Sequence, residues 1–387
     1  MTGRHLLFFE PRTEGHHLMF LQHVVEGLLE SNRQITLAID LRTDNAKAIL
    51  SEKNPSLLSE TRQINAYSKS GLFREGSELA ALATCFEESE ADSTFVNSLD
   101  GFASSLLRRA AIGLRPPNIL RGRLGGIYER PRWYSTKFNS LNQIIKSIGF
   151  NRLSKGNWFD QICLLNEFFA EDMSRDFPNT SFQFLPTPGP RITIPKKEAR
   201  THLGVPEDAL VLLNYGVGHR RKGLHLVTAA LESIRSSKLY LLCAGKQNHD
   251  PNTLQATLRL EEEGHAKVIN RYITEAEESL CFRASDYVLA PYLSHFGNSN
   301  ILAQAVLAGR PVIASDFDLI GQRVRTKKLG ILFKDQSLSD LITKLRQIDA
   351  APHAAKDSYN SAIEKYAEEL SIESFQIALH TAYPKLN

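Results

Sequence analysis

The chain has 387 residues, of which 42% are hydrophobic and 23% are charged. This composition is typical of globular proteins, and the length predicts two domains, because one hydrophobic core seldom organises so many residues. The formal net charge of +3 is too small to indicate a nucleic acid partner. No stretch is apolar over the length that a bilayer requires, and the apolar run at 6–9 is too short for a signal peptide, so we expect a cytoplasmic protein.

The cysteines and acidic pairs predict no metal site. The four cysteines lie far apart, beside apolar stretches and without the spacing of metal ligands, so we expect reduced, buried thiols at Cys85, Cys163, Cys243 and Cys281. The motif Asp316-Phe317-Asp318 has the letters of a metal-binding pair. Because it follows an apolar run that predicts a strand, we interpret it as a structural turn.

Apolar runs and helical patterns alternate along the N-terminal half, which predicts a parallel sheet wrapped by helices. The predicted strands comprise residues 4–9, 34–39, 62–66, 94–97 and 161–165. The predicted helices comprise residues 18–28, 75–88, 102–112 and 137–148.

Prolines mark the predicted boundary between the domains. The segment Leu185-Pro186-Thr187-Pro188-Gly189-Pro190 interrupts both periodicities, and the alternation resumes at Leu210. We predict an N-terminal Rossmann-like domain over 1–187, a C-terminal one over 188–365, and a helical segment, 366–387, that packs back toward the N-terminal domain. The expected fold class is α/β, with two doubly wound domains facing a cleft.

At the first junction of the C-terminal half, the apolar run 209–215 enters the turn 216–223, and a helical pattern follows. Glycines such as Gly218 let the backbone approach a ligand closely. Arg220, Arg221 and Lys222 can supply charge-assisted hydrogen bonds to phosphate oxygens. A solvated basic turn would show the same pattern.

Two further junctions have the same form. One apolar run ends at Gly245, and another, at 286–291, precedes Gly297, Asn298, Ser299 and Asn300 at the start of a helical pattern. An anion near 299–301 would meet free amides and the positive end of a helix dipole. Each glycine alone is typical of a turn, but ligands of open parallel sheets bind at the carboxyl ends of the strands. The three junctions together predict a diphosphate site.

A basic stretch at 108–137 contains one acid, Glu129. Its cations are Arg108, Arg109, Arg115, Arg121, Arg123, Arg130, Arg132 and Lys137. The stretch could face an anionic acceptor or make a peripheral contact with the inner face of a membrane, whereas arginines on solvated helix faces would look the same. The interleaved Tyr128, Trp133 and Tyr134 suit a membrane interface and equally suit packing under a loop.

The C-terminal half resembles the retaining GT-B glycosyltransferases of family 4, or group 1. The resemblance is carried by Leu212–Gly216, Arg221–Leu224, Leu242–Gly245, Asn270–Ile273, Ala284–Pro291 and Ala303–Ser315, and it covers the N-terminal half only in outline. It implies transfer of a hexose from a nucleotide diphosphate sugar, of UDP or GDP type, without a metal. The implied acceptor is a hydroxyl group on a glycan, a lipid-linked molecule or a small molecule.

The resemblance also implies roles for particular residues. Lys222, together with Arg221 or Arg220, would contact the diphosphate. The stretch Arg271, Tyr272 and Ile273 would lie against the base, mostly through backbone groups. The loop residues Gly297, Asn298 and Ser299 would approach the phosphates at the helix start.

Two positions depart from the family pattern. Its members usually carry two glutamates across the last loop and helix, one near the donor sugar and one on the ribose, where this chain has Phe296 and Gln304. Glutamine can still hydrogen-bond a ribose hydroxyl, whereas phenylalanine cannot replace a carboxylate.

In the N-terminal half, Gly15 and His16 follow the first predicted strand, where related enzymes place a glycine-rich loop near the donor phosphate. His16 could equally begin a helix. Asp100 follows another predicted strand and could contact acceptor hydroxyls or cap the helix that begins near Phe102.

The sequence therefore predicts a hexosyltransferase with Lys222, Arg221, His16 and Asp100 as catalytic residues. Two alternatives stay open. One is a non-catalytic GT-B-like protein that binds a nucleotide sugar or a partner enzyme, and the other is a nucleotide-sugar epimerase.

Overall fold

The computed structural model describes residues 4–12, 16–42, 55–68, 71–135, 140–351 and 358–385. The chain forms two compact units. Unit 1 consists of Met1–Pro186 and Ile372–Asn387, and unit 2 consists of Thr187–Ser371. The first boundary lies within the proline-rich segment, and the chain returns to unit 1 at Ile372, where the sequence placed the change at residue 366.

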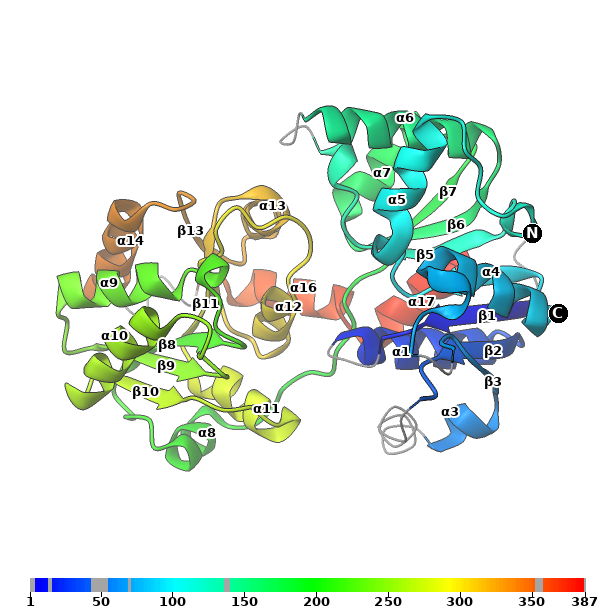
Figure 1. Ribbon diagram of the computed structural model, residues 1–387. Coiled ribbons are helices and arrows are strands. Elements are labelled where there is room, and N and C mark those ends of the chain that lie inside the picture. Colours follow the sequence, from blue (N-terminus) through cyan, green and yellow to red (C-terminus); the bar gives the residue numbers. More distant parts are fainter. Residues whose placement is uncertain are drawn as a thin grey trace. The chain divides into compact units, whose positions relative to one another are not determined.

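Unit 1 is a doubly wound α/β domain (Figure 1). Within its described residues it has a seven-stranded parallel sheet with the order β3-β2-β1-β4-β5-β6-β7. The strands are β1 (His5–Glu10), β2 (Gln34–Ile39), β3 (Arg62–Asn65), β4 (Ser93–Val96), β5 (Leu124–Tyr128), β6 (Phe159–Leu164) and β7 (Ser181–Phe184). The helices are α1 (His16–Glu30), α3 (Pro55–Ser59), α4 (Glu78–Ser89), α5 (Asp100–Ala111), α6 (Leu141–Lys155), α7 (Glu167–Asp176) and α17 (Ile372–Ala382).

Side chains of the central strands alternate between two core layers of unit 1. Leu7 and Phe9 of β1 pack with α4, α5 and α6, whereas Leu6 and Phe8 pack with α1 and α17. Helix α17 is tied to α1 by the side-chain amide of Gln376, which donates to the carbonyl of His23 at 2.9 Å. The C-terminal helix is therefore part of this domain.

Unit 2 repeats the architecture with a six-stranded parallel sheet, again within its described residues, in the order β10-β9-β8-β11-β12-β13. The strands are β8 (Leu210–Tyr215), β9 (Leu239–Ala244), β10 (Ala266–Ile269), β11 (Tyr287–Ala290), β12 (Val312–Ser315) and β13 (Gly330–Phe333). The helices are α8 (Lys196–Leu203), α9 (Leu224–Ile234), α10 (Pro251–Glu262), α11 (Glu275–Ala284), α12 (Asn300–Leu307), α13 (Asp318–Lys327), α14 (Leu338–Ala350) and α16 (Asn360–Glu369).

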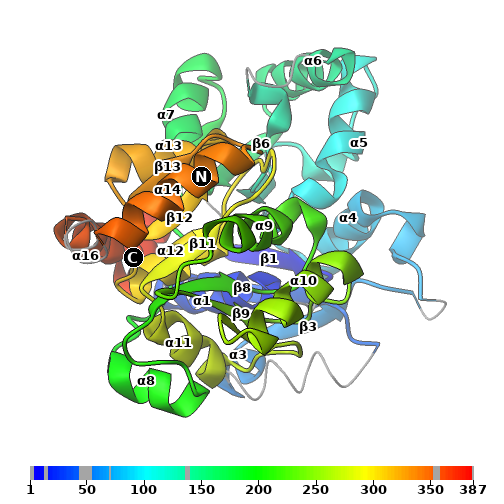
Figure 2. The same ribbon diagram turned by 90° about the vertical axis from the view of Figure 1, so that its left-hand side faces the viewer.

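Helices cover both faces of the second sheet. Helices α9 and α10 lie on one face and α8 and α11 on the other (Figure 1, Figure 2). Leu210 and Leu212 of β8 enter the first layer, and Val211 and Leu213 enter the second. The predicted fold class, two Rossmann-like α/β domains, is confirmed.

Some elements of unit 1 were not predicted, and one has other bounds than predicted. The sequence missed β5, whose Gly125 and Gly126 lower its strand character, and it also missed α7 and β7. Gly126 has φ of 135°, and a Cβ there would lie 2.0 Å from the carbonyl oxygen of Val96, so glycine is required for the close pairing of β5 with β4. The helix predicted at 137–148 begins at Leu141 and continues to Lys155.

Candidate donor site

The predicted donor residues gather at one edge of the unit 2 sheet. They follow the carboxyl ends of β8, β9, β10 and β11, which are neighbours in the strand order. The chain leaves β8 toward β9 and β10 on one side and reaches β11, β12 and β13 on the other. The carboxyl edge between β8 and β11 is therefore a topological switch point, the usual ligand position in an open α/β sheet.

Lys222 is the half-buried cation of this edge. It is the last residue of a 3-10 turn (Arg220–Lys222) that precedes α9. A Cβ added to Gly216, directly after β8, would lie 2.7 Å from the Lys222 amine. Burial, followed by the charge of Arg221, lowers the pKa of Lys222 to about 8. Among the described residues no acid pairs with this amine, which leaves it available to an anion.

The two neighbouring arginines are exposed, and they differ in their surroundings. The backbone carbonyl of Arg221 accepts a hydrogen bond from the amide of Leu293 at 2.8 Å. This bond joins the basic turn to the loop after β11. The guanidinium of Arg220 is 72% exposed and lies 3.9 Å from the carboxylate of Asp250.

Glycines allow the loops after β8 and β9 to approach each other. A Cβ on Gly245 would lie 2.4 Å from the carbonyl oxygen of Gly216, and one on Gly218 would lie 2.3 Å from Oε1 of Gln247. Gln247 was not among the predicted site residues. Its buried side-chain amide donates to the carbonyls of Gly216 and Gly245, both at 2.9 Å, and so holds the two loops together. Its position two residues after Gly245 was the only sequence signal.

The loop after β11 is held by its own side chains. The amide of Gly297 donates to Asp318 at 3.3 Å. The Asn298 side chain donates to the Thr187 hydroxyl at 2.7 Å and accepts from Arg323 at 2.7 Å. Since these groups already have partners, the Gly297 amide and the Asn298 side chain shape the loop.

The start of α12 provides free backbone donors. Ser299 is its N-cap residue, but the Ser299 side chain makes no capping hydrogen bond. Within residues 140–351 the structure shows no acceptor for the amides of Ser299, Asn300 and Ile301. Gln304 lies one turn after Asn300 on this helix and is half-buried. Phe296, at the position where family members usually carry a glutamate, is only 3% exposed and is part of the core.

After β10, the side chains of Arg271, Tyr272 and Ile273 differ in pairing and exposure. Arg271 donates to Glu277 at 2.9 Å and to the carbonyl of Tyr272 at 3.0 Å. This pairing lowers the pKa of Glu277 to about 2. Tyr272 is 85% exposed, and Ile273 is buried. The guanidinium of Arg271 is thus already neutralised by Glu277, and the Tyr272 side chain is open to solvent.

Residues 209–349, all within unit 2, match the family model described as glycosyl transferases group 1. This part of unit 2 is similar to the group 1 glycosyltransferases.

Solved structures have the same fold as this chain. Sucrose-phosphate synthase from Thermosynechococcus elongatus is 15% identical, with a TM-score of 0.71 over 98% of both chains. HepE of Anabaena, in complex with UDP, is 14% identical, with a TM-score of 0.69 over 98% of this chain and 100% of the other. A glycosyltransferase from Rickettsia africae is 12% identical, with a TM-score of 0.66 over 99% of both. Curated proteins gave no match.

Unit 1 places Asp100 at the edge of a pocket. Asp100 is the first residue of α5, and its carboxylate accepts from the amides of Glu129 at 2.8 Å and Arg130 at 3.1 Å. Of the two alternatives for Asp100, capping of its own helix is not what the structure shows. Burial, followed by the charge of Glu129, raises the pKa of Asp100 to about 6.

The pocket beside Asp100 is rich in cations. It is lined by α5, the segment after β5 and the start of α6, with charged residues Arg12, Asp100, Glu129, Arg130, Arg132 and Lys146. Burial, followed by the charges of Arg108 and Arg132, lowers the pKa of Lys146. The pocket therefore suits an anionic group. Gly15 lies outside the described residues, and His16 is the first residue of α1.

The aromatic residues of the basic stretch are packed inside unit 1. Trp133 and Tyr128 are each 6% exposed, and the Trp133 indole donates to the Tyr128 hydroxyl at 3.0 Å. The Tyr134 hydroxyl donates to Asp176 at 2.6 Å. Of the two alternatives for these residues, packing under a loop is the one that the structure shows.

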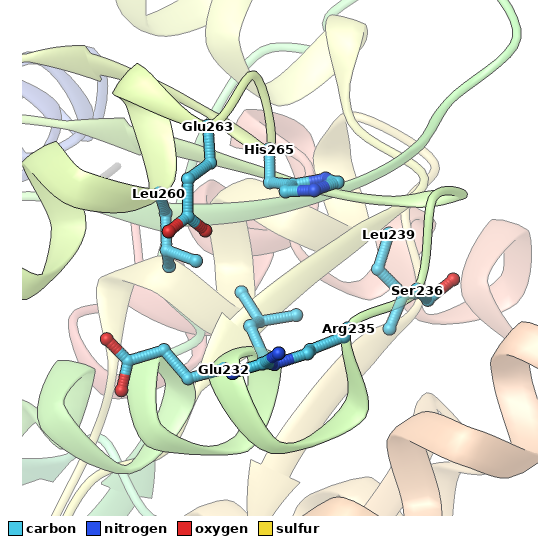
Figure 3. Close-up of a pocket in the computed structure, with 8 residues that line it drawn as sticks. Glu232, Arg235, Ser236, Leu239, Leu260, Glu263 and His265 are labelled. Carbon is cyan, nitrogen blue, oxygen red and sulfur yellow. The ribbon is translucent and has the colours of Figure 1, made fainter.

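Two other features lie outside the predicted chemistry. A pocket between α9 and α10 opens at the amino ends of β9 and β10, on the edge opposite the donor residues, and is lined by Glu232, Arg235, Glu263 and His265 (Figure 3). In Asp316-Phe317-Asp318, Asp316 accepts from the amide of Asp335 at 2.9 Å. No metal-binding cluster of His, Cys, Asp or Glu occurs among the described residues.

Proposed function

We propose that this chain is a group 1 glycosyltransferase, which transfers a hexose from a uridine diphosphate hexose to a hydroxyl acceptor with retention at the anomeric carbon. Two features carry the proposal: the free amine of Lys222 after β8 and the unpaired amides at 299–301 after β11, the strand next to β8 in the sheet. The printed descriptions of the HepE structures name UDP and UDP-glucose as ligands, which supports uridine before guanosine.

Negative charge develops on the β-phosphate as the bond from the anomeric carbon to the phosphate oxygen breaks. A fixed cation and backbone donors stabilise this charge more in the transition state than in the ground state, and this difference accelerates the reaction. Lys222 supplies the cation, and the start of α12 supplies the amides and the positive end of a helix dipole. Arg221 is the second cation within reach of the diphosphate.

The proposed transfer is a same-face displacement. The acceptor oxygen forms a bond to the anomeric carbon as the diphosphate leaves, and a departing phosphate oxygen takes the acceptor proton. This route requires neither a carboxylate nucleophile nor a metal ion. The apolar, buried Phe296 at the position where relatives carry a glutamate is compatible with it.

For the acceptor, we propose the pocket beside Asp100 in unit 1. Asp100 can accept a hydrogen bond from a sugar hydroxyl, and Lys146 and Arg130 can meet an anionic group on the same molecule. Gly15 and His16 remain proposed contacts of the donor phosphate, with a role that follows only from the family resemblance.

A calorimetric comparison of UDP, GDP and ADP tests the donor site, because the three share the diphosphate and differ in the base. We expect UDP to bind most tightly, and the Lys222→Ala variant to lose affinity for all three. Incubation with UDP-glucose and a panel of sugar and sugar-phosphate acceptors then tests transfer. Preference for GDP would indicate a guanosine diphosphate sugar as the donor instead. Tight nucleotide binding without hydrolysis or transfer would contradict the catalytic proposal. Conversion of the donor sugar without an acceptor would indicate an epimerase.

A further inference from the structure

Helix α6 has apolar residues on two opposite faces. Its inner face carries the buried Phe150 and Leu153, which join the core of unit 1. Its outer face carries Leu141, Ile144 and Ile148, which are 73%, 55% and 45% exposed and follow the spacing of one helical stripe. A surface helix of a soluble domain normally has a polar outer face. The outer face of α6 therefore needs a different explanation.

The end of α5 extends this apolar surface. Arg152, one turn after Ile148 on α6, donates to the carbonyls of Ala110 at 3.3 Å and Ala111 at 2.5 Å. The next residues of the chain include Ile112 and Leu114, which are 75% and 49% exposed. We call Ile112, Leu114, Leu141, Ile144 and Ile148 together the α5–α6 surface. Figure 1 shows the two helices side by side.

Positive charge surrounds the α5–α6 surface. Between residues 101 and 158 the sequence contains one acid, Glu129. Three arginines, Arg115, Arg121 and Arg152, line a pocket between the ends of α5 and α6, next to Leu114, and no acidic side chain of the described chain lines it. The guanidinium of Arg121 donates to the carbonyl of Gly156 at 3.3 Å, which holds it at this pocket.

We propose that the α5–α6 surface docks on an anionic lipid bilayer. The aliphatic side chains enter the boundary between headgroups and acyl chains, and the three arginines of the pocket bind lipid phosphates. Aliphatic residues beside arginines, without acids, are the composition of an interfacial membrane helix. Charge complementarity favours this occupant over a neutral protein surface. The proposal concerns unit 1 alone and does not depend on the donor site.

The α5–α6 surface overlaps only in part with residues 108–137, for which the sequence suggested a membrane contact. Trp133 and Tyr128 are buried, so they do not anchor the chain at an interface. Of the exposed apolar residues, Leu141, Ile144 and Ile148 lie on α6, beyond that stretch, whereas Ile112 and Leu114 lie within it. No helix among the described residues is long and apolar enough to span a bilayer.

Co-sedimentation of the full chain with vesicles tests the proposal. Vesicles of phosphatidylcholine alone are compared with vesicles that also contain phosphatidylglycerol, at low and high salt. The apolar variant combines Leu141→Ser, Ile144→Ser and Ile148→Ser, all at exposed positions, and the charge variant is Arg115→Gln. The matched controls are Ile377→Ser, at a residue 62% exposed on α17, and Arg325→Gln on α13 of unit 2.

We expect wild type to bind only the anionic vesicles, more weakly at high salt. The apolar variant should lose at least about tenfold in partitioning, and Arg115→Gln about fivefold, with both controls unchanged. Failure of wild type to bind anionic vesicles at low salt would overturn the proposal, as would equal binding by the apolar variant. A wild-type dimer that the apolar variant converts to a monomer would assign the surface to a second copy of the chain, and would also overturn it.

Discussion

The amine of Lys222 lies against the backbone of Gly216, where a Cβ would be only 2.7 Å from it. Gly216 also has φ of 100°, which L side chains rarely adopt. We expect Gly216→Ala to displace the Lys222 amine and to lower turnover of the donor by about tenfold to a hundredfold, because small displacements of catalytic groups are costly. Steady-state kinetics with UDP-glucose measures this loss.

Gly204→Ala is the matched control for backbone strain. Gly204 ends α8 with φ of 63°, and an added Cβ there meets nothing within 4 Å. Both variants place alanine in the left-handed region, and only the variant at position 216 disturbs Lys222. Equal activity of the two variants would contradict the catalytic position of Lys222.

Removal of the Lys222 side chain should reduce turnover strongly. The charge on the leaving diphosphate would lose its principal cation, so we expect Lys222→Ala to lower kcat by about a hundredfold, as for the loss of one oxyanion donor. Single-turnover hydrolysis of UDP-glucose is the measurement. Arg220→Ala removes a nearby exposed cation that lies by Asp250, and it should cost much less. Undiminished kcat in folded Lys222→Ala would exclude the proposed role.

Binding of UDP should weaken at alkaline pH. The pKa of Lys222 is lowered to about 8, so the cation that meets the diphosphate is lost as the pH rises through that value. Once the amine is neutral, the apparent affinity should fall by about tenfold per pH unit, until the neutral form itself binds. Calorimetry at pH values on both sides of 8 tests this. Lys222→Arg, which stays charged, should bind without this dependence, and the same alkaline loss in that variant would assign it to another group.

The buried carboxylate of Asp286 should be essential for the stability of unit 2. It accepts from Arg200 at 2.7 Å and from the amide of Val211 at 2.9 Å, and Lys196 lies at 2.5 Å. Asp286→Ala leaves the buried Arg200 without its counter-ion, so we expect a loss of about 3–5 kcal/mol in the free energy of unfolding. Denaturant unfolding measures the loss. Glu364→Ala, which breaks the exposed pair with Arg191, should cost less than about 1 kcal/mol.

Acid should weaken the same interaction. Burial alone would raise the pKa of Asp286, but the hydrogen bonds and charges from Lys196, the Val211 amide and Arg200 outweigh it, and the net pKa lies below its ordinary value. The stabilisation is therefore present above the unfolded-state pKa of 3.8 and is lost as the pH falls through the folded-state value. Asp286→Ala should lack this part of the acid dependence of stability. An identical acid profile in wild type and variant would argue against it.

The sequence by itself determined the fold class and the edge of the sheet where the donor residues gather. Strand β2 has the bounds that its apolar run predicted, and the basic turn after β8 and the loop after β11 were both predicted to follow strands. Local periodicity and glycine spacing depend on neighbours in the chain, so they can be read directly. Because the carboxyl ends of parallel strands meet at one edge, the grouping of the junctions follows from the alternation alone.

Only the tertiary structure decided which of these groups are free. The side chains of Asn298 and Arg271, two residues of the predicted donor site, are bonded to Thr187 and Glu277. Gln247 joins two loops through contacts that no local pattern predicts. The availability of a polar or apolar side chain depends on partners that are remote in the chain, as the exposed Ile144 and the buried Trp133 also show. Spacing along the chain contains no information about those partners, because folding brings them together through packing of whole elements.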